Sequence, residues 1–369
     1  MAQPLVLFET RRARSGSEVG FATLNAEPSL NALSLAMAEE LLAQLHEWRD
    51  DPAIACVVLQ GAGEKAFCAG GDIVALYEWL TAVDFTAVER YFVQEYTLDY
   101  FLHSFPKPVL CWGNGIVMGG GLGLLVASSH RVVTESSRLA TPEVSIGLYP
   151  DVGASWFLPR MPGRTGLYVG LTGTHLNAAD ALFGSLADYF VPNSERPQLF
   201  EQLLSVEWSD SPRANHHTLS QLLREYRGEY DLPASTLRAH FDLINAITDH
   251  GSVEEILQAL ESHAVSEAWL QRAAQTLRDG SPTSAKVIFE IYHRAPRLSL
   301  KEIFALELGL TMQFAQHPDF REGIRARLID KDNQPHWSPA TLAEVGDSYI
   351  EEHFASPWSA SQHPFKAWV

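Results

Sequence analysis

The 369-residue sequence predicts an α/β fold in which strands, glycine turns and helices recur, followed by a helical C-terminal region. Two continuous apolar runs, Ile54–Leu59 and Val109–Trp112, are typical of strands that are covered on both faces in a parallel sheet. Each run leads into a glycine-rich turn and then into a helical pattern, over residues 54–80 and again over 109–127. This recurrence indicates ββα-type units that repeat in spacing but not in residue identity.

The N-terminal part predicts a hairpin followed by a helix. Leu5–Glu9 and Val19–Leu24 are short β-type runs with glycine and serine between them. Apolar residues then recur every three or four positions from Leu33 to Trp48, and Ser34 is a suitable N-cap for this helix. Further helices are expected from Ile73, over Phe85–His103 and over Leu122–Ala127, and further strands over Arg131–Thr134 and Leu139–Thr141.

From Thr165 onwards almost every segment has helical periodicity. We therefore expect an α/β core over residues 1–200 and a helical region over residues 201–369. The polar stretch Ser209–His217 is expected to be a loop in which His216 and His217 are solvated. The helices are predicted over Leu167–Leu171, Ala178–Phe183, Leu199–Leu204, Leu219–Tyr226, Leu237–Ile247, Val253–Ser262, Glu267–Leu277, Pro282–His293 and Leu300–Phe314.

The composition excludes several classes of function. A formal net charge of −18 argues against a nucleic-acid partner, because phosphate binding needs a basic face. No apolar run approaches the ~18 residues of a membrane span. Residues 1–20 lack the apolar core of a secretory signal, and the early acid Glu9 disfavours a transit peptide. Three widely spaced cysteines suit a reducing compartment, so we expect a cytoplasmic protein with no membrane partner.

Two glycine turns are candidates for binding an oxyanion. Gly70 and Gly71 precede Asp72, an N-cap candidate, and Gly119–Gly121 stand at the head of the apolar helix 122–127. Glycines let a ligand approach backbone N–H groups closely, and the start of a helix favours negative charge. A single turn of this kind is more often structural, but two of them favour an oxyanion site.

Two acids, Glu143 and Asp151, follow the second glycine turn in the proline-bounded loop TPEVSIGLYPDVG. They could transfer protons or attack a carbonyl carbon, although a lone loop acid is more often simply solvated. The motifs GxGxxG, GxxxxGK[ST], GxSxG and HExxH are absent, so no nucleotide cofactor or metal is expected. Cys68 is expected to be a buried, inert thiol, because no histidine lies near it in the sequence.

Three of these segments together resemble the crotonase (enoyl-CoA hydratase/isomerase) superfamily: FCAGGDI, GNGIVMGGGLGL and PEVSIGLYPDVG. The resemblance extends from LNALSLAM near the start to DFREGIRARLIDKDNQPHW near the end. It is nearest to the branch that hydrolyses 3-hydroxyisobutyryl-CoA in valine breakdown. It implies a crotonase-like spiral of ββα units with a helical C-terminal part. It also implies an acyl-CoA substrate, with coenzyme A as part of the substrate and no separate cofactor.

The resemblance also assigns roles to individual residues. The backbone N–H groups of Gly71 and Gly120 would form the oxyanion hole. Glu143 matches the catalytic acid of the superfamily, and Asp151 matches the second acid of the hydrolase branch. Glu95 falls where that branch carries an acid that contacts the substrate.

Position 123 separates the branches of the superfamily. Two-glutamate hydratases and dienoyl-CoA isomerases carry an acid there, whereas this chain has Gly123, which cannot position a water as a carboxylate does. Hydrolysis through Glu143 and Asp151 is therefore the expected reaction. An enoyl-CoA isomerase or hydratase of the same superfamily and a non-catalytic acyl-CoA-binding member remain the alternatives.

One segment departs from the family pattern. The superfamily often has a basic residue before LNAL, but Ala26–Ser29 contains no lysine or arginine. Contacts to the coenzyme phosphates would then fall to Arg131, Arg160, Arg164 or Lys331. Members of the superfamily often form trimers or hexamers, so a homo-oligomer is also an open expectation here.

Overall fold

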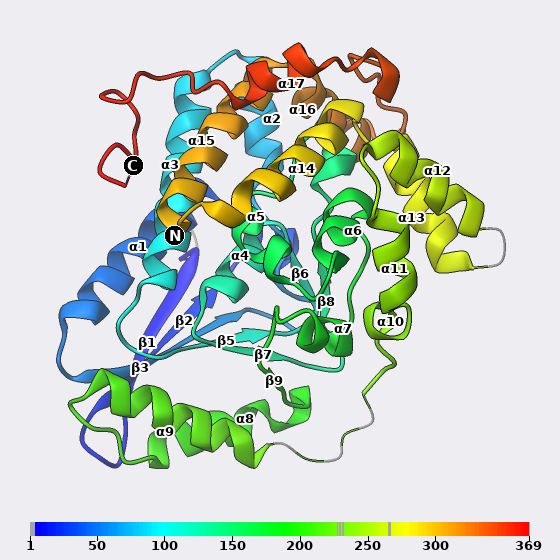
Figure 1. The fold of residues 1–369 in the computed structure, drawn as a ribbon. Helices are drawn as coiled ribbons and strands as arrows, with labels where there is room; N and C mark the ends of the chain where they lie inside the picture. Colours follow the sequence, from blue (N-terminus) through cyan, green and yellow to red (C-terminus); the bar gives the residue numbers. More distant parts are fainter. Residues whose placement is uncertain (1–3, 227, 229, 231, 265–266, 369) are drawn as a thin grey trace. The chain divides into compact units, whose positions relative to one another are not determined.

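The computed structural model describes residues 4–226, 228, 230, 232–264 and 267–368, and Figure 1 shows its ribbon. The chain divides into two compact units, each assembled from three separate segments. Unit 1 contains residues 1–71, 97–139 and 176–238, and unit 2 contains residues 72–96, 140–175 and 239–369.

Unit 1 is built on two sheets whose strands alternate along the chain. The larger sheet has the order β1-β2-β3-β5-β7-β9, in which β1 is antiparallel to β2 and the other pairs are parallel. The smaller sheet has the order β4-β6-β8. The strands are β1 Val6–Arg12, β2 Glu18–Leu24, β3 Ile54–Gly61, β4 Ala66–Cys68, β5 Val109–Gly113, β6 Ile116–Met118, β7 His130–Val133, β8 Arg138–Ala140 and β9 Tyr189–Phe190.

The predicted ββα recurrence is confirmed, with β3–β4–α2 followed in the chain by β5–β6–α4. The first strand of each repeat joins the larger sheet, and the second strand joins the smaller one. The short strands β4, β6 and β9 were not predicted, because two or three residues carry too little periodicity to be distinguished from a turn.

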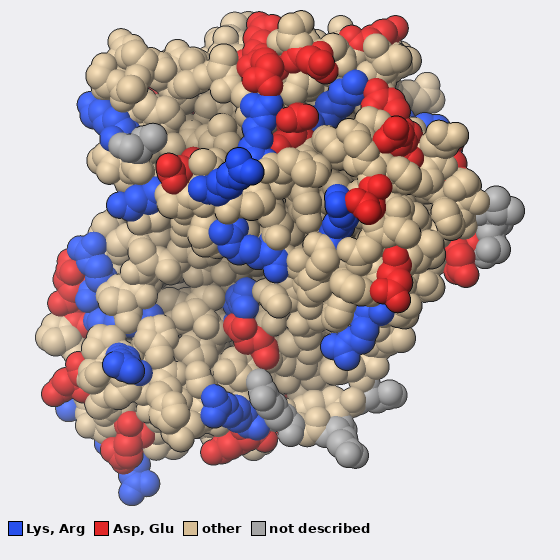
Figure 2. All heavy atoms as spheres, viewed as in Figure 1, with Lys and Arg blue, Asp and Glu red and all other residues tan. Residues whose placement is uncertain are grey.

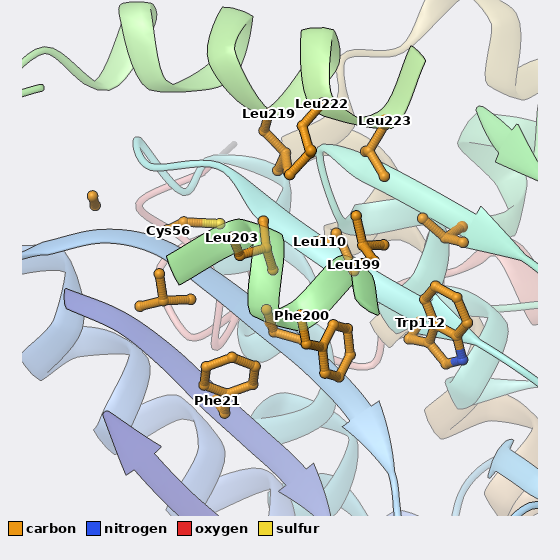
Figure 3. Packing of buried hydrophobic residues seen from close by; sticks show 14 of the residues in the cluster. Phe21, Cys56, Leu110, Trp112, Leu199, Phe200, Leu203, Leu219, Leu222 and Leu223 are labelled. Carbon is orange, nitrogen blue, oxygen red and sulfur yellow. The ribbon is translucent and has the colours of Figure 1, made fainter. Parts of the chain in front are cut away.

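The core of unit 1 lies between the larger sheet and two helices, α8 (Arg196–Ser205) and α9 (Pro212–Glu225). Figure 3 shows leucines of both helices directed toward aromatic and aliphatic side chains of the strands. The cluster contains Phe21 of β2, Cys56 of β3 and Trp112 of β5, all almost completely buried. Continuous apolar strands are thus covered, as their sequences predict. Unit 1 also contains α1 Leu35–Asp50, α4 Gly120–Ala127 and α7 Ala178–Phe183.

Unit 2 is mainly helical. The long helix α15 (Leu300–Gln316) packs against α5 (Ala154–Phe157), α16 (Pro318–Ile324) and α17 (Asp347–Phe354). A capping box begins α15: Ser299 accepts from the Glu302 N–H, and the Glu302 carboxylate accepts from the Ser299 N–H. The other helices of unit 2 are α2 Ile73–Thr81, α6 Thr165–Thr172, α11 Phe241–Thr248, α12 Val253–His263, α13 Ala268–Asp279 and α14 Pro282–Arg294. The division of the chain falls within α3 (Phe85–His103), after Tyr96, within β8, after Leu139, and within α10 (Thr236–Ala239), after Arg238.

The predicted loop at residues 209–217 is wrong from Pro212 onwards. Ser211 caps α9 by accepting a hydrogen bond from the Ala214 N–H, and proline is the first residue of the helix. This serine–proline start outweighs the polarity of the segment. His216 is not solvated as expected, because it is half-buried in α9 and its ring stacks on His130. His217 is exposed, but on a helix rather than in a loop.

The helical character predicted after residue 200 is confirmed, since β9 is the last strand among the described residues. The proposed domain limit at residue 200 remains a prediction. Leu237–Ile247 forms two helices instead of one, separated at His240. Within the described ranges, the structure contains no helix with the length and hydropathy needed to cross a bilayer.

Candidate active site

The candidate oxyanion site lies in unit 1, where the two glycine turns meet. Gly70 has φ +111° and Gly119 has φ +49°, and L side chains rarely adopt such values. A Cβ atom at Gly70 would lie 3.2 Å from the Met118 carbonyl oxygen. A Cβ atom at Gly121 would lie only 2.2 Å from the Cys68 carbonyl oxygen, so glycine is required there. The turns that precede α2 and α4 are therefore in direct backbone contact.

The N–H groups of Gly71 and Gly120 fit the role that the resemblance implies. Gly71 forms an isolated parallel bridge with Leu33. In this bridge the Leu33 N–H donates to the Gly70 carbonyl oxygen at 2.8 Å, so that hydrogen bond does not use the Gly71 N–H. Gly120 is the first residue of α4, where helical N–H groups have no partner inside the helix. The Gly119 carbonyl oxygen accepts hydrogen bonds from the N–H groups of Leu122 and Gly123, which lie further along the helix than Gly120. Their use as an oxyanion hole remains a proposal.

Cys68 is fully buried beside this turn, and its thiol lies 3.6 Å from the Gly70 carbonyl oxygen. This placement agrees with the expected buried thiol. Within the described residues, no cluster of three or more histidine, cysteine, aspartate or glutamate side chains is suited to a metal ion.

The three predicted acids lie together in unit 2. Glu143 begins a 3-10 helix, Glu143–Ile146, and Asp151 lies in the turn that precedes α5. Glu95 comes from α3, about fifty residues earlier in the chain. All three are buried, with exposed fractions of 3–5%. The tertiary structure therefore brings together side chains from separate elements, and neither Glu143 nor Asp151 is a solvated loop acid.

Burial and mutual repulsion favour the protonated forms of these acids. Burial raises the pKa of Glu143 well above its usual value, and the nearby Asp151 charge raises it further. The pKa of Glu95 is raised for the same two reasons, against a hydrogen bond with Tyr91 that lowers it. Burial raises the pKa of Asp151 to about 6, against a lowering effect of the Tyr96 hydroxyl. The cluster thus holds protons near neutral pH, as an acid–base site requires.

The two central acids differ in their hydrogen-bond partners. The Tyr96 hydroxyl lies 2.6 Å from Asp151 Oδ2. By contrast, Glu143 Oε2 is buried and accepts no hydrogen bond from any part of the chain that the structure describes. A buried carboxylate oxygen without a protein partner is available to a water molecule or a substrate.

A fourth buried acid, Glu307 of α15, holds the turn that carries Asp151. Its two carboxyl oxygens accept hydrogen bonds from the N–H groups of Gly153 at 2.8 Å and Ser155 at 3.0 Å. Burial raises the pKa of Glu307 to about 8. Glu307 belongs to no motif and was not among the predicted site residues, although a single acid within the apolar run Phe304–Met312 was an available signal.

Most of the basic residues considered for the coenzyme phosphates are already engaged. Arg131 forms a bidentate ion pair with Asp188, and Arg164 pairs with Asp249 at 2.6 Å. Arg160 stacks on the Trp156 ring at 3.2 Å. Figure 2 shows lysine and arginine side chains spread over the face drawn, many of them beside acidic ones. A phosphate would have to compete with these acids for Arg131 and Arg164.

Comparison with known proteins agrees with this geometry. Residues 19–354 match the family described as enoyl-CoA hydratase/isomerase. The chain belongs to the enoyl-CoA hydratase/isomerase family. It is 38% identical to a protein of Danio rerio named "3-hydroxyisobutyryl-CoA hydrolase, mitochondrial", over 93% of this chain and 91% of that protein. It is 37% identical to a protein of Arabidopsis thaliana named "3-hydroxyisobutyryl-CoA hydrolase 1", over 92% and 89% of the two chains.

Two solved structures of the family share the fold and have other names. An enoyl-CoA hydratase from Rhodobacter sphaeroides 2.4.1 is 34% identical and superposes with a TM-score of 0.84, over 96% of this chain and 98% of that chain. A carnitinyl-CoA dehydratase from Mycobacterium thermoresistibile is 33% identical, with a TM-score of 0.85 over 96% and 97% of the two chains. The predicted fold class, a crotonase-like α/β fold with a helical C-terminal part, is confirmed.

Substituting Gly121 with alanine should destabilise the protein by about 2–3 kcal/mol, because the new methyl group would overlap the Cys68 carbonyl oxygen. Gly309→Ala is the matched control, since this glycine is also buried in a helix and its Cβ would meet only atoms at 3.9 Å or more. We expect it to stabilise by about 0.5–1 kcal/mol through helix propensity. Urea unfolding measures the change in the free energy of unfolding of each variant. The same change in Gly121→Ala and Gly309→Ala would contradict the close packing at Gly121.

The Glu307→Gln variant should gain stability relative to the unmodified protein as the pH rises from 5 to 8. The folded pKa of Glu307, about 8, lies above the ordinary value of 4.5. Its contribution to stability is therefore fully present below pH 4.5 and is lost as the pH rises toward 8. Glutamine cannot ionise, so the difference should reach on the order of 4 kcal/mol. Urea unfolding at several pH values tests this prediction, and Glu47→Gln is the control because Glu47 is exposed. If the difference in the free energy of unfolding between Glu307→Gln and the unmodified protein is the same at every pH, the prediction is contradicted.

Proposed function

We propose that this chain hydrolyses 3-hydroxyisobutyryl-CoA to 3-hydroxyisobutyrate and coenzyme A, a reaction of valine breakdown. The observation that carries the proposal is the buried cluster of Glu95, Glu143 and Asp151, combined with a glycine at position 123. A hydratase of this family would need an acid at position 123, whereas hydrolysis does not. The names of the relatives from Danio rerio and Arabidopsis thaliana support the same reaction.

The backbone N–H groups of Gly71 and Gly120 would stabilise the negative charge that develops on the thioester oxygen. Donors at the start of α4 also gain from the partial positive charge of the helix terminus. Because the two turns are locked in backbone contact, these donors need little rearrangement during the reaction.

Glu143 would either attack the thioester carbon to form an anhydride or take a proton from the attacking water. Both routes need an ionised carboxylate, and a raised pKa makes that carboxylate a stronger base. Asp151 would give its proton to the leaving thiolate sulfur as the carbon–sulfur bond breaks. Glu95 would accept a hydrogen bond from the 3-hydroxyl group of the substrate. The overall reaction adds one water and forms one acid and one thiol.

We infer that the reaction needs no cofactor besides the coenzyme A that the substrate carries. A cytoplasmic location and a homo-oligomeric state also remain proposals. The name of the Danio rerio relative includes "mitochondrial", so fractionation of the source cells is the direct test of location.

Enoyl-CoA hydration or isomerisation is the second candidate, because two structures with TM-scores above 0.8 are named enoyl-CoA hydratase and carnitinyl-CoA dehydratase. An isomerase needs only an oxyanion hole and one base, which Glu143 could supply. A non-catalytic acyl-CoA-binding role is the third possibility, and it predicts binding without turnover.

Thiol release from a panel of thioesters tests the proposal. We expect fast release from 3-hydroxyisobutyryl-CoA and 3-hydroxypropionyl-CoA, and slow release from acetyl-CoA and crotonyl-CoA, because only the first two carry the hydroxyl group that Glu95 would bind. Loss of crotonyl absorbance without thiol release would instead establish hydration and overturn the proposal. Removal of metals by a chelator should leave the rate unchanged.

Glu143→Gln should lower kcat for thiol release by roughly 10²–10⁴-fold, because the amide can neither attack nor accept a proton. Binding of coenzyme A thioesters should persist, as measured by calorimetry with the variant. The exposed Glu47→Gln is the control for a glutamate substitution outside the cluster and should keep full activity. Full activity of Glu143→Gln would remove Glu143 from the mechanism.

A further inference from the structure

Three hydroxyl groups link Asp151 to the backbone of α15 in a continuous chain. The Tyr96 oxygen lies 2.6 Å from Asp151 Oδ2 and 2.8 Å from Thr311 Oγ1. The Tyr149 oxygen lies 2.9 Å from Thr311 Oγ1 and donates to the Glu307 carbonyl oxygen at 2.7 Å. The side chains of Tyr96, Tyr149 and Thr311 are completely buried, so the protein itself must supply the hydrogens for these contacts.

The chain has four oxygen–oxygen contacts, and its hydrogens can be counted. When Asp151 is ionised, only the three hydroxyl hydrogens are present. Tyr149 uses its hydrogen on the Glu307 carbonyl, which can only accept, and Tyr96 uses its hydrogen on Asp151. Thr311 can then fill only one of its two contacts. In the other contact, two oxygen atoms face each other at 2.8 or 2.9 Å without a hydrogen between them.

A proton on Asp151 supplies the missing hydrogen. Asp151 then donates to Tyr96, Tyr96 to Thr311, Thr311 to Tyr149, and Tyr149 to the backbone. All four contacts are filled, and every hydrogen bond points in the same direction along the chain. Because an unfilled buried contact is costly, the hydroxyl chain stabilises protonated over ionised Asp151.

We propose that the Tyr96–Thr311–Tyr149 hydroxyl chain favours the protonated form of Asp151 and so prepares Asp151 to enter the reaction as a proton donor. The proposal rests on the hydrolysis proposed above. Thr311 and Tyr149 act through Tyr96 and are positioning residues. No hydroxyl group of the described residues bonds to Glu143 Oε2, so the chain of hydroxyl groups acts on Asp151 and not on that oxygen of Glu143.

The proton balance of the reaction closes around this pair. On the water route, Glu143 takes a proton from water as the hydroxide adds to the acyl carbon, and the leaving sulfur takes the Asp151 proton as its bond to carbon breaks. On the anhydride route, Asp151 gives its proton to the sulfur in the same way, and water then hydrolyses the anhydride. Tyr96 then turns its hydrogen toward the new Asp151 carboxylate. Transfer of the proton from Glu143 to Asp151 restores the starting protonation state, and the hydrogen bonds along the chain return to their original direction.

The surrounding charges act in the same direction as the hydroxyl chain. Among the described residues, the titratable groups that face Asp151 are acids and phenols, so none of them favours its ionised form by charge. Burial adds to this effect and raises the pKa of Asp151 to about 6, whereas a hydrogen bond donated by Tyr96 lowers it. Tyr96 can make that donation only by leaving one contact of Thr311 without a hydrogen, which reduces its lowering effect. The groups are Glu95 of α3, Glu143 of the 3-10 helix, Glu307 of α15, and the phenols of Tyr96 and Tyr149.

Thr311→Val tests the proposal, because it keeps the shape of the side chain and removes the hydroxyl. In this variant, Tyr96 can donate to an ionised Asp151, and every remaining contact then has a hydrogen. A protonated Asp151 would itself donate to Tyr96, and the Tyr96 hydrogen would then have no acceptor. We expect the pKa of Asp151 to fall by about one pH unit, the equivalent of one neutral hydrogen bond. The measurement is the infrared absorption of the protonated carboxyl group in the free enzyme, assigned by its loss in Asp151→Asn.

Two further variants complete the infrared experiment. Thr248→Val is the matched control, because Thr248 is also a fully buried threonine of unit 2 and bonds only to carbonyl oxygens of its own helix, α11. It should leave the Asp151 titration unchanged. Tyr149→Phe removes two contacts and one hydrogen. The two remaining hydroxyl hydrogens then fill the two remaining contacts when Asp151 is ionised. This variant should shift the Asp151 pKa in the same direction as Thr311→Val, and it keeps the test decisive if Thr311→Val does not fold.

The pH dependence of thiol release from 3-hydroxyisobutyryl-CoA tests the donor role separately. A required proton donor loses activity as the pH rises through its pKa, so the alkaline limb should move to lower pH in Thr311→Val. Movement of the acidic limb instead would make Asp151 a base and overturn its role as donor. An unchanged or upward infrared titration in both Thr311→Val and Tyr149→Phe overturns the hydroxyl chain. If the unmodified protein releases no thiol from any thioester, the proposed hydrolysis fails, and the infrared titration still decides the chain.

Discussion

The constraint on which unit 2 depends is the burial of several carboxyl groups within one unit, among them Glu95, Glu143, Asp151 and Glu307. Buried like charges cannot all ionise, so the protein must hold protons among them and stabilise each group by other means. Glu307 accepts hydrogen bonds from two backbone N–H groups, and the carboxyl group of Asp151 is hydrogen-bonded to the Tyr96 hydroxyl. If the proposed roles hold, these contacts both support the fold and prepare acid–base chemistry, since Glu307 holds the turn of Asp151 and Tyr96 bonds to its carboxyl group.

Unit 1 contributes backbone geometry instead of titratable groups. Its two glycine turns approach each other so closely that a single methyl group at Gly121 would overlap a carbonyl oxygen. Such packing keeps N–H groups in place without the entropy of a flexible side chain, which suits stabilisation of an oxyanion. The alternation of β3, β4, β5 and β6 between two sheets accounts for this contact, because consecutive repeats place equivalent turns side by side.

Membership of the enoyl-CoA hydratase/isomerase family leaves the reaction open, since relatives of similar identity are named hydrolase, hydratase and dehydratase. The fold is common to all of them, so the distinction has to come from individual side chains. Position 123 is a glycine, and Glu143 and Asp151 are both present and buried, which is the combination that the proposed hydrolysis rests on.

The sequence alone determined the elements whose signals are local: the continuous apolar strands, the caps at Ser34 and Asp72, and the glycine turns with their motifs. It also identified Glu95, Glu143 and Asp151 through resemblance, but not their environment. Polarity misled it at residues 209–217, where a serine–proline helix start outweighed composition. Only the tertiary structure decided which groups surround Asp151, because Tyr96 and Thr311 are separated by 215 positions and neither has a distinctive local pattern. The exact partners of a buried acid depend on contacts between distant segments, and periodicity and spacing carry no information about those contacts.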